Sequence, residues 1–364
     1  MHARRLGLFA AIAAALCAML GTAAAAAADT ITVRNTNDDG PGSLRRAIER
    51  ADSGDVIRVP RGRYGLTSGQ LLIDKQLSIS GAGARRTVLD ANHASRVIEV
   101  ASGLSRVVIS KLTIREGDTG MDSDGGGIHT SSDLLLSQVA LRSNVATPAE
   151  NQAGGAVYAI GAIRVTLRQS LVARNRAYNS GGVEGQDVRA IDTTFAYNSA
   201  GTPQKNGDGG ATDGVMTLID STVVGNRCFN GSGCGGGVFG PLVTTQGSLF
   251  AGNIAYESNG MPPGSPANPG APDNCGGAAV TSLGHNLDSV GDCMLSMPSD
   301  ISNVAARLRR PGGYGGPTDS FALEPSSPAL NAGARECTRR DQRGVRRPQG
   351  RRCDIGAFEL ERRR

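Results

Sequence analysis

The chain has 364 residues and a formal net charge of +5 at neutral pH, with 51 glycines, no tryptophan and 4% aromatic residues. So much glycine could indicate disorder, but valine, isoleucine and leucine recur at short intervals, so the composition indicates a core built in thin layers. The basic excess lies at the end, where residues 335–364 hold eleven arginines against five acidic residues, which excludes a uniformly basic nucleic-acid-binding protein.

The first 28 residues have the pattern of a secretory signal peptide. Arg4 and Arg5 precede an apolar stretch, residues 6–20, and a run of alanines follows up to Ala28. An uncleaved membrane anchor is the weaker interpretation, because the apolar stretch is short and diluted by alanine. Cleavage after Ala28 would remove both arginines and lower the net charge from +5 to +3. We therefore expect a secreted, extracellular or outer-surface protein with no transmembrane span after cleavage.

Residues 29–54 are predicted to form an N-terminal cap. Ser43 begins the only good helix signal in the chain, and its hydroxyl can act as the N-cap. The residues on one helical face are all apolar: Leu44, Ala47, Ile48 and Ala51. The first coil of a repeat protein needs its core covered, and an amphipathic helix would cover it.

A repeat of 27 or 28 residues is the strongest signal in the chain. Five glycine pairs occur, each followed by a small or apolar residue, with spacings between the second glycines of 28, 27, 28 and 27 residues. The pairs are Gly126-Gly127, Gly154-Gly155, Gly181-Gly182, Gly209-Gly210 and Gly236-Gly237. Each pair is followed by an element that ends in asparagine, at Asn144, Asn175, Asn198, Asn226 or Asn253. The constant order of the two motifs and the period of the glycine pairs indicate a solenoid.

The repeat unit favours short strands over helices. Apolar residues alternate, as in Ile163-Arg-Val-Thr-Leu167, and no stretch in the repeats has the length and pattern of a crossover helix. Coils of three strands and three turns must stack about 4.8 Å apart to bury their inner faces. We therefore expect an all-β fold, a right-handed parallel β-helix, with its coils over residues 55–257.

Both repeated motifs have structural roles in this interpretation. The glycines let the backbone turn tightly and take positive φ. The asparagines stack from coil to coil in a ladder, where their amides can hydrogen-bond to one another and tolerate left-handed backbone geometry. Ligand binding by the asparagines is the less favoured alternative.

The period breaks after Asn253. Residues 258–274 are predicted to form a loop rich in Gly, Pro, Asn and Ser, and loops of this kind often carry the binding surface of a solenoid. Residues 275–364 are expected to form irregular terminal coils held by disulfides. The chain ends just past Glu359 with no further apolar span, so free secretion or retention by envelope contacts is favoured over covalent anchoring.

The cysteines indicate disulfides. Loss of Cys17 with the signal peptide leaves an even number, which is typical of a disulfide set in a secreted protein. Six cysteines allow fifteen connectivities, and sequence neighbours are the simplest choice. That choice joins Cys228 to Cys234, Cys275 to Cys293, and Cys337 to Cys353. Free buried thiols and a zinc site are less favoured, the latter because no Cys-x-x-Cys spacing occurs.

Carboxylates gather in the turns around the glycine pairs, and the register of the repeat should project them from one edge of neighbouring coils. The catalytic candidates are Asp122, Asp124, Asp208 and Asp213, and further carboxylates at such turns are Asp118, Glu150, Glu184 and Asp187. Two could serve as acid and base in glycoside hydrolysis, and two or three could bind Ca²⁺. A lyase would also need a base, for which Arg142, Arg164, Arg168 and Arg174 are near in sequence. The favoured alternative is that these carboxylates only populate exposed turns.

The sequence matches no other catalytic, metal-binding or nucleotide-binding motif. The histidines left after cleavage are dispersed and match no nucleophile-elbow or zincin spacing; they are His93, His129 and His285. No metal site is predicted from them. The glycine pairs precede strands rather than helices, which excludes a phosphate-cradling nucleotide site.

The arginine-rich end allows two interpretations. It could contact anionic envelope polymers such as lipopolysaccharide or nucleic acid. Alternatively, the acidic residues interleaved with it, Asp341, Asp354 and Glu359, could form local ion pairs in a solvated end cap. The helix cap and this end both oppose head-to-tail stacking, so we expect a monomer.

Several segments resemble known families. Gly62–Leu66, Ile73–Gly83 and Thr87–Asp90 resemble the opening coils of pectate-lyase-like β-helix proteins, and Thr30–Ile48 resembles the leader that often precedes them. The repeats are similar to those of polymorphic outer-membrane proteins. The end resembles the choice-of-anchor Q domain in these motifs: Leu283–Leu287, Gly316–Thr318, Pro328–Gly333, Asp341–Gly344, Arg347-Pro348 and Cys353–Glu359. The resemblance implies a surface-associated bacterial β-helix and no particular reaction.

Two functions are therefore carried forward. The favoured one is a noncatalytic secreted or surface-associated protein whose β-helix face binds a polysaccharide or a component of an envelope or host surface. The alternative is a polysaccharide lyase or glycoside hydrolase that uses the turn carboxylates. No cofactor is expected, apart from the Ca²⁺ that the carboxylates could bind.

Overall fold

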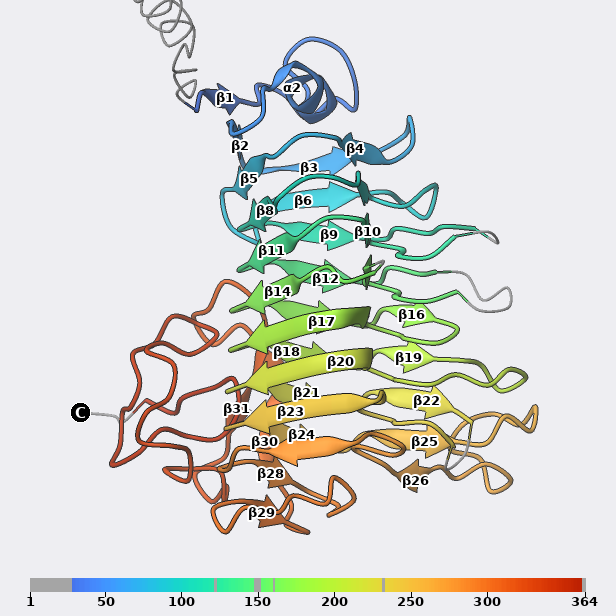
Figure 1. The fold of residues 1–364 in the computed structure, drawn as a ribbon, viewed down its shortest axis with the longest axis vertical. Helices are drawn as coiled ribbons and strands as arrows, with labels where there is room; N and C mark the ends of the chain where they lie inside the picture. The colour runs from blue at the N-terminus through green and yellow to red at the C-terminus, as the bar shows by residue number, and fades with distance from the viewer. Residues whose placement is uncertain (1–27, 121–122, 147–151, 160, 231–232, 362–364) are drawn as a thin grey trace, which may run out of the picture.

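The computed structural model describes residues 28–120, 123–146, 152–159, 161–230 and 233–361 as a solenoid of stacked coils (Figure 1). The predicted signal peptide lies outside the described residues except for Ala28. The described part of the chain contains no helix with the length and hydropathy of a membrane span.

The largest sheet runs the length of the solenoid, and its strands pair in parallel from coil to coil. Its main stack contains β1 (Thr30–Thr32), β2 (Val56–Val59), β5 (Ser78–Gly81), β8 (Val107–Ser110), β11 (Leu134–Ser137), β14 (Val165–Arg168), β17 (Val183–Ile191), β20 (Thr212–Ile219), β23 (Leu242–Gln246) and β27 (Val280–Ser282). A second stack joins it at β17 and contains β4 (Leu71–Ile73), β7 (Ile98–Val100), β10 (Ile128–Thr130) and β13 (Val157–Ala159).

Three smaller sheets complete the described strands. One contains β3 (Gly62–Gly65), β6 (Thr87–Asp90), β9 (Thr113–Arg115), β12 (Ala140–Arg142), β15 (Leu171–Ala173), β18 (Thr194–Ala196), β21 (Thr222–Val224), β24 (Leu249–Ala251), β28 (Leu287–Asp288) and β29 (Ile301–Ser302). Another contains β16 (Arg176–Ala177), β19 (Ser199–Ala200), β22 (Arg227–Phe229), β25 (Ile254–Tyr256) and β26 (Ala271–Pro272). The last is the antiparallel pair β30 (Leu308–Gly312) and β31 (Ser320–Leu323). The predicted right-handed parallel β-helix is confirmed.

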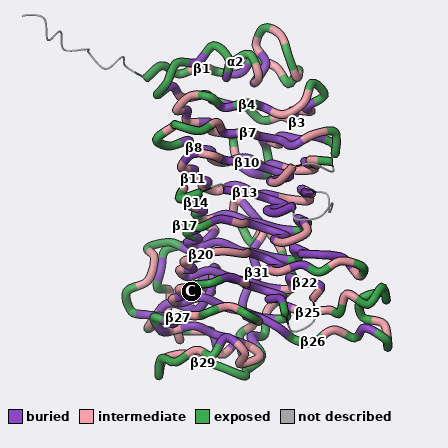
Figure 2. Tube along the Cα trace, turned by 45° about the vertical axis from the view of Figure 1, so that its right-hand side comes forward, coloured by how far each residue is buried: buried purple, intermediate pink, exposed green. Residues whose placement is uncertain are grey.

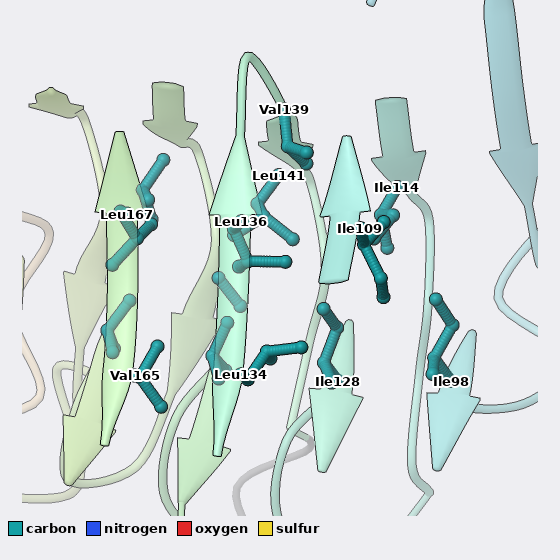
Figure 3. Close-up of a cluster of buried hydrophobic side chains, with 14 of the residues drawn as sticks. Ile98, Ile109, Ile114, Ile128, Leu134, Leu136, Val139, Leu141, Val165 and Leu167 are labelled. Atoms are coloured by element: carbon teal, nitrogen blue, oxygen red, sulfur yellow. The ribbon is translucent and has the colours of Figure 1, made fainter. Parts of the chain in front are cut away.

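The core is a set of apolar columns that run along the solenoid axis. In strands such as β8, β11 and β14, buried residues alternate with more exposed ones, so that a buried residue in one coil lies over a buried residue in the next. One such column pairs Ile109 with Leu136 and Leu136 with Leu167, and all three side chains are fully buried (Figure 3). Because each coil contributes only a few side chains, the coils depend on their neighbours for burial.

The predicted cap is present as α2 (Leu44–Arg50). The Ser43 hydroxyl accepts a hydrogen bond from the Arg46 amide at 3.2 Å, and this bond satisfies one of the free N–H groups of the first turn. The apolar face predicted from the sequence is buried against the first coils at Leu44, Ala47, Ile48 and Ala51. The N-terminal capping helix of the predicted fold is thus confirmed.

The glycine pairs are explained by close approach between coils more than by positive φ, which corrects the expectation. Of the ten glycines, only Gly154 has positive φ. A Cβ at Gly181 would lie 2.5 Å from the carbonyl oxygen of Gly210, in the next coil. Strand register aligns Gly155 with Gly181, and Gly181 with Gly210. First and second glycines therefore alternate along the stack: the second glycine of one pair lies over the first of the next, which in turn lies over the second glycine of the pair after it.

The five predicted asparagines lie in one continuous ladder. In each, the backbone N–H and Nδ2 both donate to Oδ1 of the next member, at 2.9–3.0 Å for the first four and at 3.4 and 2.8 Å for Asn253. Asn253 donates to Asn274, a sixth member that breaks the period. The left-handed residue is the one before each of the five predicted asparagines, such as Tyr197 at φ 59°, and not the asparagine itself.

The six cysteines are joined as sequence neighbours, in the bonds Cys228–Cys234, Cys275–Cys293 and Cys337–Cys353. Residues 304–361, here called the fold-back segment, run back along the outside of the solenoid instead of stacking as further coils (Figure 1). Phe321 of this segment packs against alanine and leucine side chains on the outer face of β12, β15 and β18. Its Asp319 reaches Arg85, 234 residues earlier, at 2.6 Å.

Candidate functional site

Five partly exposed side chains form one line across five consecutive coils. They are the outward-facing residues of aligned strands: Glu99 in β7, His129 in β10, Tyr158 in β13, Glu184 in β17 and Asp213 in β20. Strand register makes each of them the direct partner of the next. In Figure 2, β7, β10 and β13 lie one below another on the face toward the viewer. We call this set the polar column.

The upper end of the polar column is held by an arginine. Arg96 is 8% exposed and donates to the carbonyl oxygens of Asp124 and Gly125 at 2.8 and 3.1 Å. It also pairs with Oε2 of Glu99, while Oε1 of Glu99 lies 2.7 Å from Nδ1 of His129. The orientation of the His129 ring is therefore set by Glu99, as a carboxylate partner commonly does for histidine.

Tyr158 continues the line with an aromatic surface. Its ring is stacked with that of His129, with centroids 5.7 Å apart and planes inclined by 16°. Burial raises the pKa of the Tyr158 phenol, and the negative charges of Asp124 and Glu184 raise it further. The phenol is therefore a hydrogen-bond donor over the neutral pH range.

The lower end of the polar column holds two carboxyl groups whose pKa values are raised. Burial, and then the charges of Asp213, Asp124 and Asp208, raise the pKa of Glu184 to about 8. Burial and the charge of Asp208 raise the pKa of Asp213 to about 6, although the Gly214 N–H opposes this shift. Oε2 of Glu184 is buried and has no hydrogen-bond partner among the described residues. At pH 7, Glu184 is mostly protonated and Asp213 is mostly ionised.

The predicted catalytic carboxylates are partly brought together. Asp124 and Asp208, in the loops beside the polar column, act on Glu184 through their charges, and burial raises the pKa of Asp208. Oδ1 of Asp124 accepts from the Ala153 amide at 2.7 Å. Asp122 and Glu150 lie outside the described residues. The remaining candidates have local partners, since Asp118 accepts from the Gly120 amide and Asp187 pairs with Arg164.

The arginines considered as lyase bases do not join the polar column. Arg142 pairs with Asp319 of the fold-back segment, and Arg164 pairs with Asp187. Arg174 lies over the ring of Tyr197, 5.3 Å from its centroid. Arg168 is at the end of β14 and not on a strand of the column. A lyase would therefore have to take its base from another residue.

A hollow of about 520 Å³ lies beside the upper end of the polar column. Its lining includes His93, Arg96, Asp118 and Ser123. This volume falls within the range of about 300–1,000 Å³ that is common for ligand sites. Arg96 connects the hollow to Glu99 and so to the rest of the column.

The described residues offer one close group of metal-ligating atoms, formed by Asp288, Asp292 and Cys293. Cys293 is bonded to Cys275, so its sulfur is not a thiolate ligand. Within the described ranges, the carboxylates around Glu184 do not form such a close group. Ca²⁺ binding there stays a prediction.

Comparison with known proteins yields structural likenesses only. No family model matches the chain, and no curated protein matches it. The chain is similar to the pectate lyase Pel9A, with 15% identity and a TM-score of 0.46, over 91% of this chain and 96% of that one. It is also similar to ORF18 of Geobacillus virus E2, with 11% identity and a TM-score of 0.25, over 63% of this chain and 60% of that one. Neither likeness assigns a reaction or a site residue to this chain.

Sequence analysis alone missed three members of the column, Glu99, His129 and Tyr158. A usable signal existed, because each is the middle residue of a short strand whose neighbours are apolar or small. The alignment of these three residues could not be predicted because it depends on the strand register between adjacent coils. His129 is two residues after the second glycine of its pair and Tyr158 is three, yet the strands align these two directly. Counting from the glycines therefore misaligns the outward-facing residues of adjacent coils.

Proposed function

We propose that this is an extracellular protein that binds a polysaccharide along the polar column. The observation that carries the proposal is the column itself, five outward-facing polar or aromatic side chains aligned across five consecutive coils. Successive coils of a parallel β-helix are about 4.8 Å apart, so the column spans about 19 Å. An extended ligand with a short repeat, such as a glycan chain, suits this geometry.

The side chains of the column suit sugar hydroxyls and sugar faces. Aromatic rings such as Tyr158 combine an apolar surface with a polar edge, which matches the amphipathic faces of a pyranose ring. Glu99 and ionised Asp213 can accept from hydroxyl groups, and protonated Glu184 can also donate. The buried, unpaired Oε2 of Glu184 favours a ligand that supplies the missing hydrogen bond.

The charge of this region favours a neutral polysaccharide. Glu99 and Asp213 in the column and Asp124 and Asp208 in the loops carry or can carry negative charge, and only Arg96 is placed to offset it at the upper end. An acidic glycan would be repelled unless a cation such as Ca²⁺ bound with it. Binding to a neutral glycan needs no such cation.

We further propose secretion, and membership of the C-terminal region in the choice-of-anchor Q family. Three disulfides favour an oxidising compartment. Two motif segments that carry the resemblance are in contact, since Nδ1 of His285 lies 2.9 Å from the carbonyl oxygen of Ala332. Recovery of the mature protein from the medium or from the cell surface of the producing organism would support secretion, and recovery only with reduced thiols inside the cell would contradict it.

The substitution Tyr158→Ala is expected to weaken binding to neutral polysaccharides about tenfold or more, because it removes the aromatic surface at the centre of the column. The measurement is affinity electrophoresis or calorimetry of residues 29–364 on a panel of neutral and acidic polysaccharides. Each is run with calcium and with chelator.

Tyr314→Ala is the matched control, because Tyr314 is exposed and lies on the fold-back segment. It should bind as the unaltered protein does. Equal binding by the Tyr158 and Tyr314 variants to a glycan that the protein retains would show that the polar column is not the binding face.

A second candidate, glycoside hydrolysis, is favoured by the two perturbed carboxyl groups. Glu184 and Asp213 are direct register partners on adjacent coils, and their pKa values of about 8 and about 6 give one acid and one base at pH 7. Hydrolysis needs such a pair on either side of a glycosidic bond. Release of new reducing ends from a bound polysaccharide would establish this function.

A further inference from the structure

The basic end of the chain contains a short hairpin, residues 339–347, here called the arginine hairpin. Arg340 and Arg346 are antiparallel partners, and the Arg347 amide donates to the Arg339 carbonyl oxygen at 3.0 Å. Inside the turn, the Asp341 amide donates to the Val345 carbonyl oxygen at 2.8 Å. The backbone thus holds four arginines in two facing pairs.

These four arginines surround a hollow. Arg339, Arg340, Arg346 and Arg347 line a depression of about 450 Å³. The first three are exposed, and Arg347 is 5% exposed at its base. Nε of Arg347 is buried without a hydrogen-bond partner among the described residues. The Arg347 guanidinium is itself fully buried, 3.6–4.0 Å from carboxylate oxygens of Asp192, Asp220 and Glu359. A group that entered the hollow would therefore meet the exposed Arg339, Arg340 and Arg346.

Among the described residues, the neighbouring carboxylates pair with only one of the four arginines that line the hollow, Arg347. Asp341 accepts from Arg343 and from backbone amides, and Asp354 and Glu359 accept mainly from backbone amides. Among the described residues, no carboxylate forms an ion pair with Arg339, Arg340 or Arg346. The local ion pairs expected from the sequence are confined to Arg343 and Arg347.

Like charges that face each other directly across two strands destabilise the pairing. The Arg340–Arg346 pair has this arrangement, and an anion between the guanidinium groups would remove the repulsion. Guanidinium groups bind phosphate and sulfate oxygens through paired hydrogen bonds, with a geometry that suits planar, fixed donors. A bound tetrahedral oxyanion would therefore relieve the repulsion between Arg340 and Arg346.

We propose that the arginine hairpin is a binding site for a tetrahedral oxyanion, a phosphate or sulfate group carried by an anionic glycan. The site is separate from the polar column, because the fold-back segment lies at the left of the solenoid in Figure 1 and the loops beside the column extend to the right. It does not depend on the proposed function of the column. The protein would then hold a charged polymer on one side and a neutral one on the other.

The test uses residues 29–364 in sodium chloride, sodium phosphate and sodium sulfate at equal ionic strength. Phosphate or sulfate at about 100 times the dissociation constant should raise the melting temperature by about 5 °C relative to chloride. The double variant Arg340→Gln/Arg346→Gln should lose most of this increase. In dilute chloride it should melt no lower than the unaltered protein, because both side chains are exposed and their repulsion is gone.

The control is Arg335→Gln/Arg351→Gln, which changes the net charge equally at two exposed arginines that do not line the hollow. Sulfate and phosphate also stabilise proteins by exclusion from the surface, and this general effect should be the same in both variants. Equal increases in the two double variants, or none in the unaltered protein, would overturn the proposal. Retention on a sulfated or phosphorylated polysaccharide, but not on a carboxylated one, distinguishes the tetrahedral oxyanion from a uronate.

Discussion

Replacing Asn198 with alanine is expected to lower the free energy of unfolding by about 3–5 kcal/mol, because several buried hydrogen bonds lose a partner at once. Oδ1 of Asn198 accepts from the amide and Nδ2 of Asn175. Its Nδ2 donates to the Val172 carbonyl oxygen at 3.0 Å and to Oδ1 of Asn226 at 2.9 Å. The side chain is fully buried, so water cannot replace these bonds without opening the coil.

Urea or thermal unfolding of residues 29–364 measures this effect. Asn206→Ala is the control, because Asn206 is exposed in the loop after β19 and should change the stability by less than about 0.5 kcal/mol. In a solenoid each coil contacts only its neighbours, so the loss should also appear as earlier hydrogen exchange in the coils around Asn198. A loss no larger than that of the control would mean that the ladder does not stabilise the stack.

Glu184→Gln is expected to abolish any polysaccharide hydrolysis, by at least about 100-fold, because glutamine cannot donate a proton to the leaving group. In the unaltered protein, activity should rise as Asp213 ionises near pH 6 and fall as Glu184 loses its proton near pH 8. The optimum therefore lies close to pH 7. New reducing ends, measured from pH 4 to 10, report the profile.

The same substitution should stabilise the protein at high pH. Between the usual pKa of a glutamate, 4.5, and about 8, the folded chain holds a proton on Glu184 that the unfolded chain has released. Stability must therefore fall as pH rises through this window. Glutamine does not titrate, so Glu184→Gln should be more stable by up to about 5 kcal/mol at pH 9 and nearly unchanged at pH 4.

Glu336→Gln is the control for both measurements, since Glu336 is exposed on the fold-back segment. It should alter neither the activity nor the dependence of stability on pH. If Glu184→Gln retained full hydrolysis while losing the pH dependence of stability, Glu184 would be a buried acid of the binding face and not the catalytic acid. If the unaltered protein hydrolyses nothing on the panel, binding is the remaining function of the column.

Much of the fold was predictable because each coil of a solenoid repeats the same local sequence pattern. Alternating apolar residues, glycine pairs and periodic asparagines each recur once per coil, so errors in one coil are corrected by the others. Asn198, for example, was placed in the ladder because it ends the element that follows the glycine pair Gly181-Gly182. Asn274 was missed because an inserted loop separates it from Asn253, although the structure bonds the two directly at 2.8 Å.

The candidate site was only partly predictable. Asp124, Asp208 and Asp213 were identified from their nearness to the glycine pairs, whereas Glu99, His129 and Tyr158 were not. Strand register decides which outward residues meet, and a shift of one residue moves a side chain to the opposite face of the sheet. The register of the glycine pairs alternates by one residue from coil to coil, so counting residues from the glycines does not reveal which outward-facing residues are aligned.

The sequence by itself determined the class of fold, the capping helix and the ladder, because these depend on local pattern and on a short repeat. Only the tertiary structure decided that residues 304–361 fold back, that Asp319 reaches Arg85, and that Arg339, Arg340 and Arg346 are left without acidic partners. These contacts join residues far apart in the chain, and no local periodicity encodes them. The polar column is intermediate: its residue types stand in the sequence, but the stacking of coils makes them neighbours.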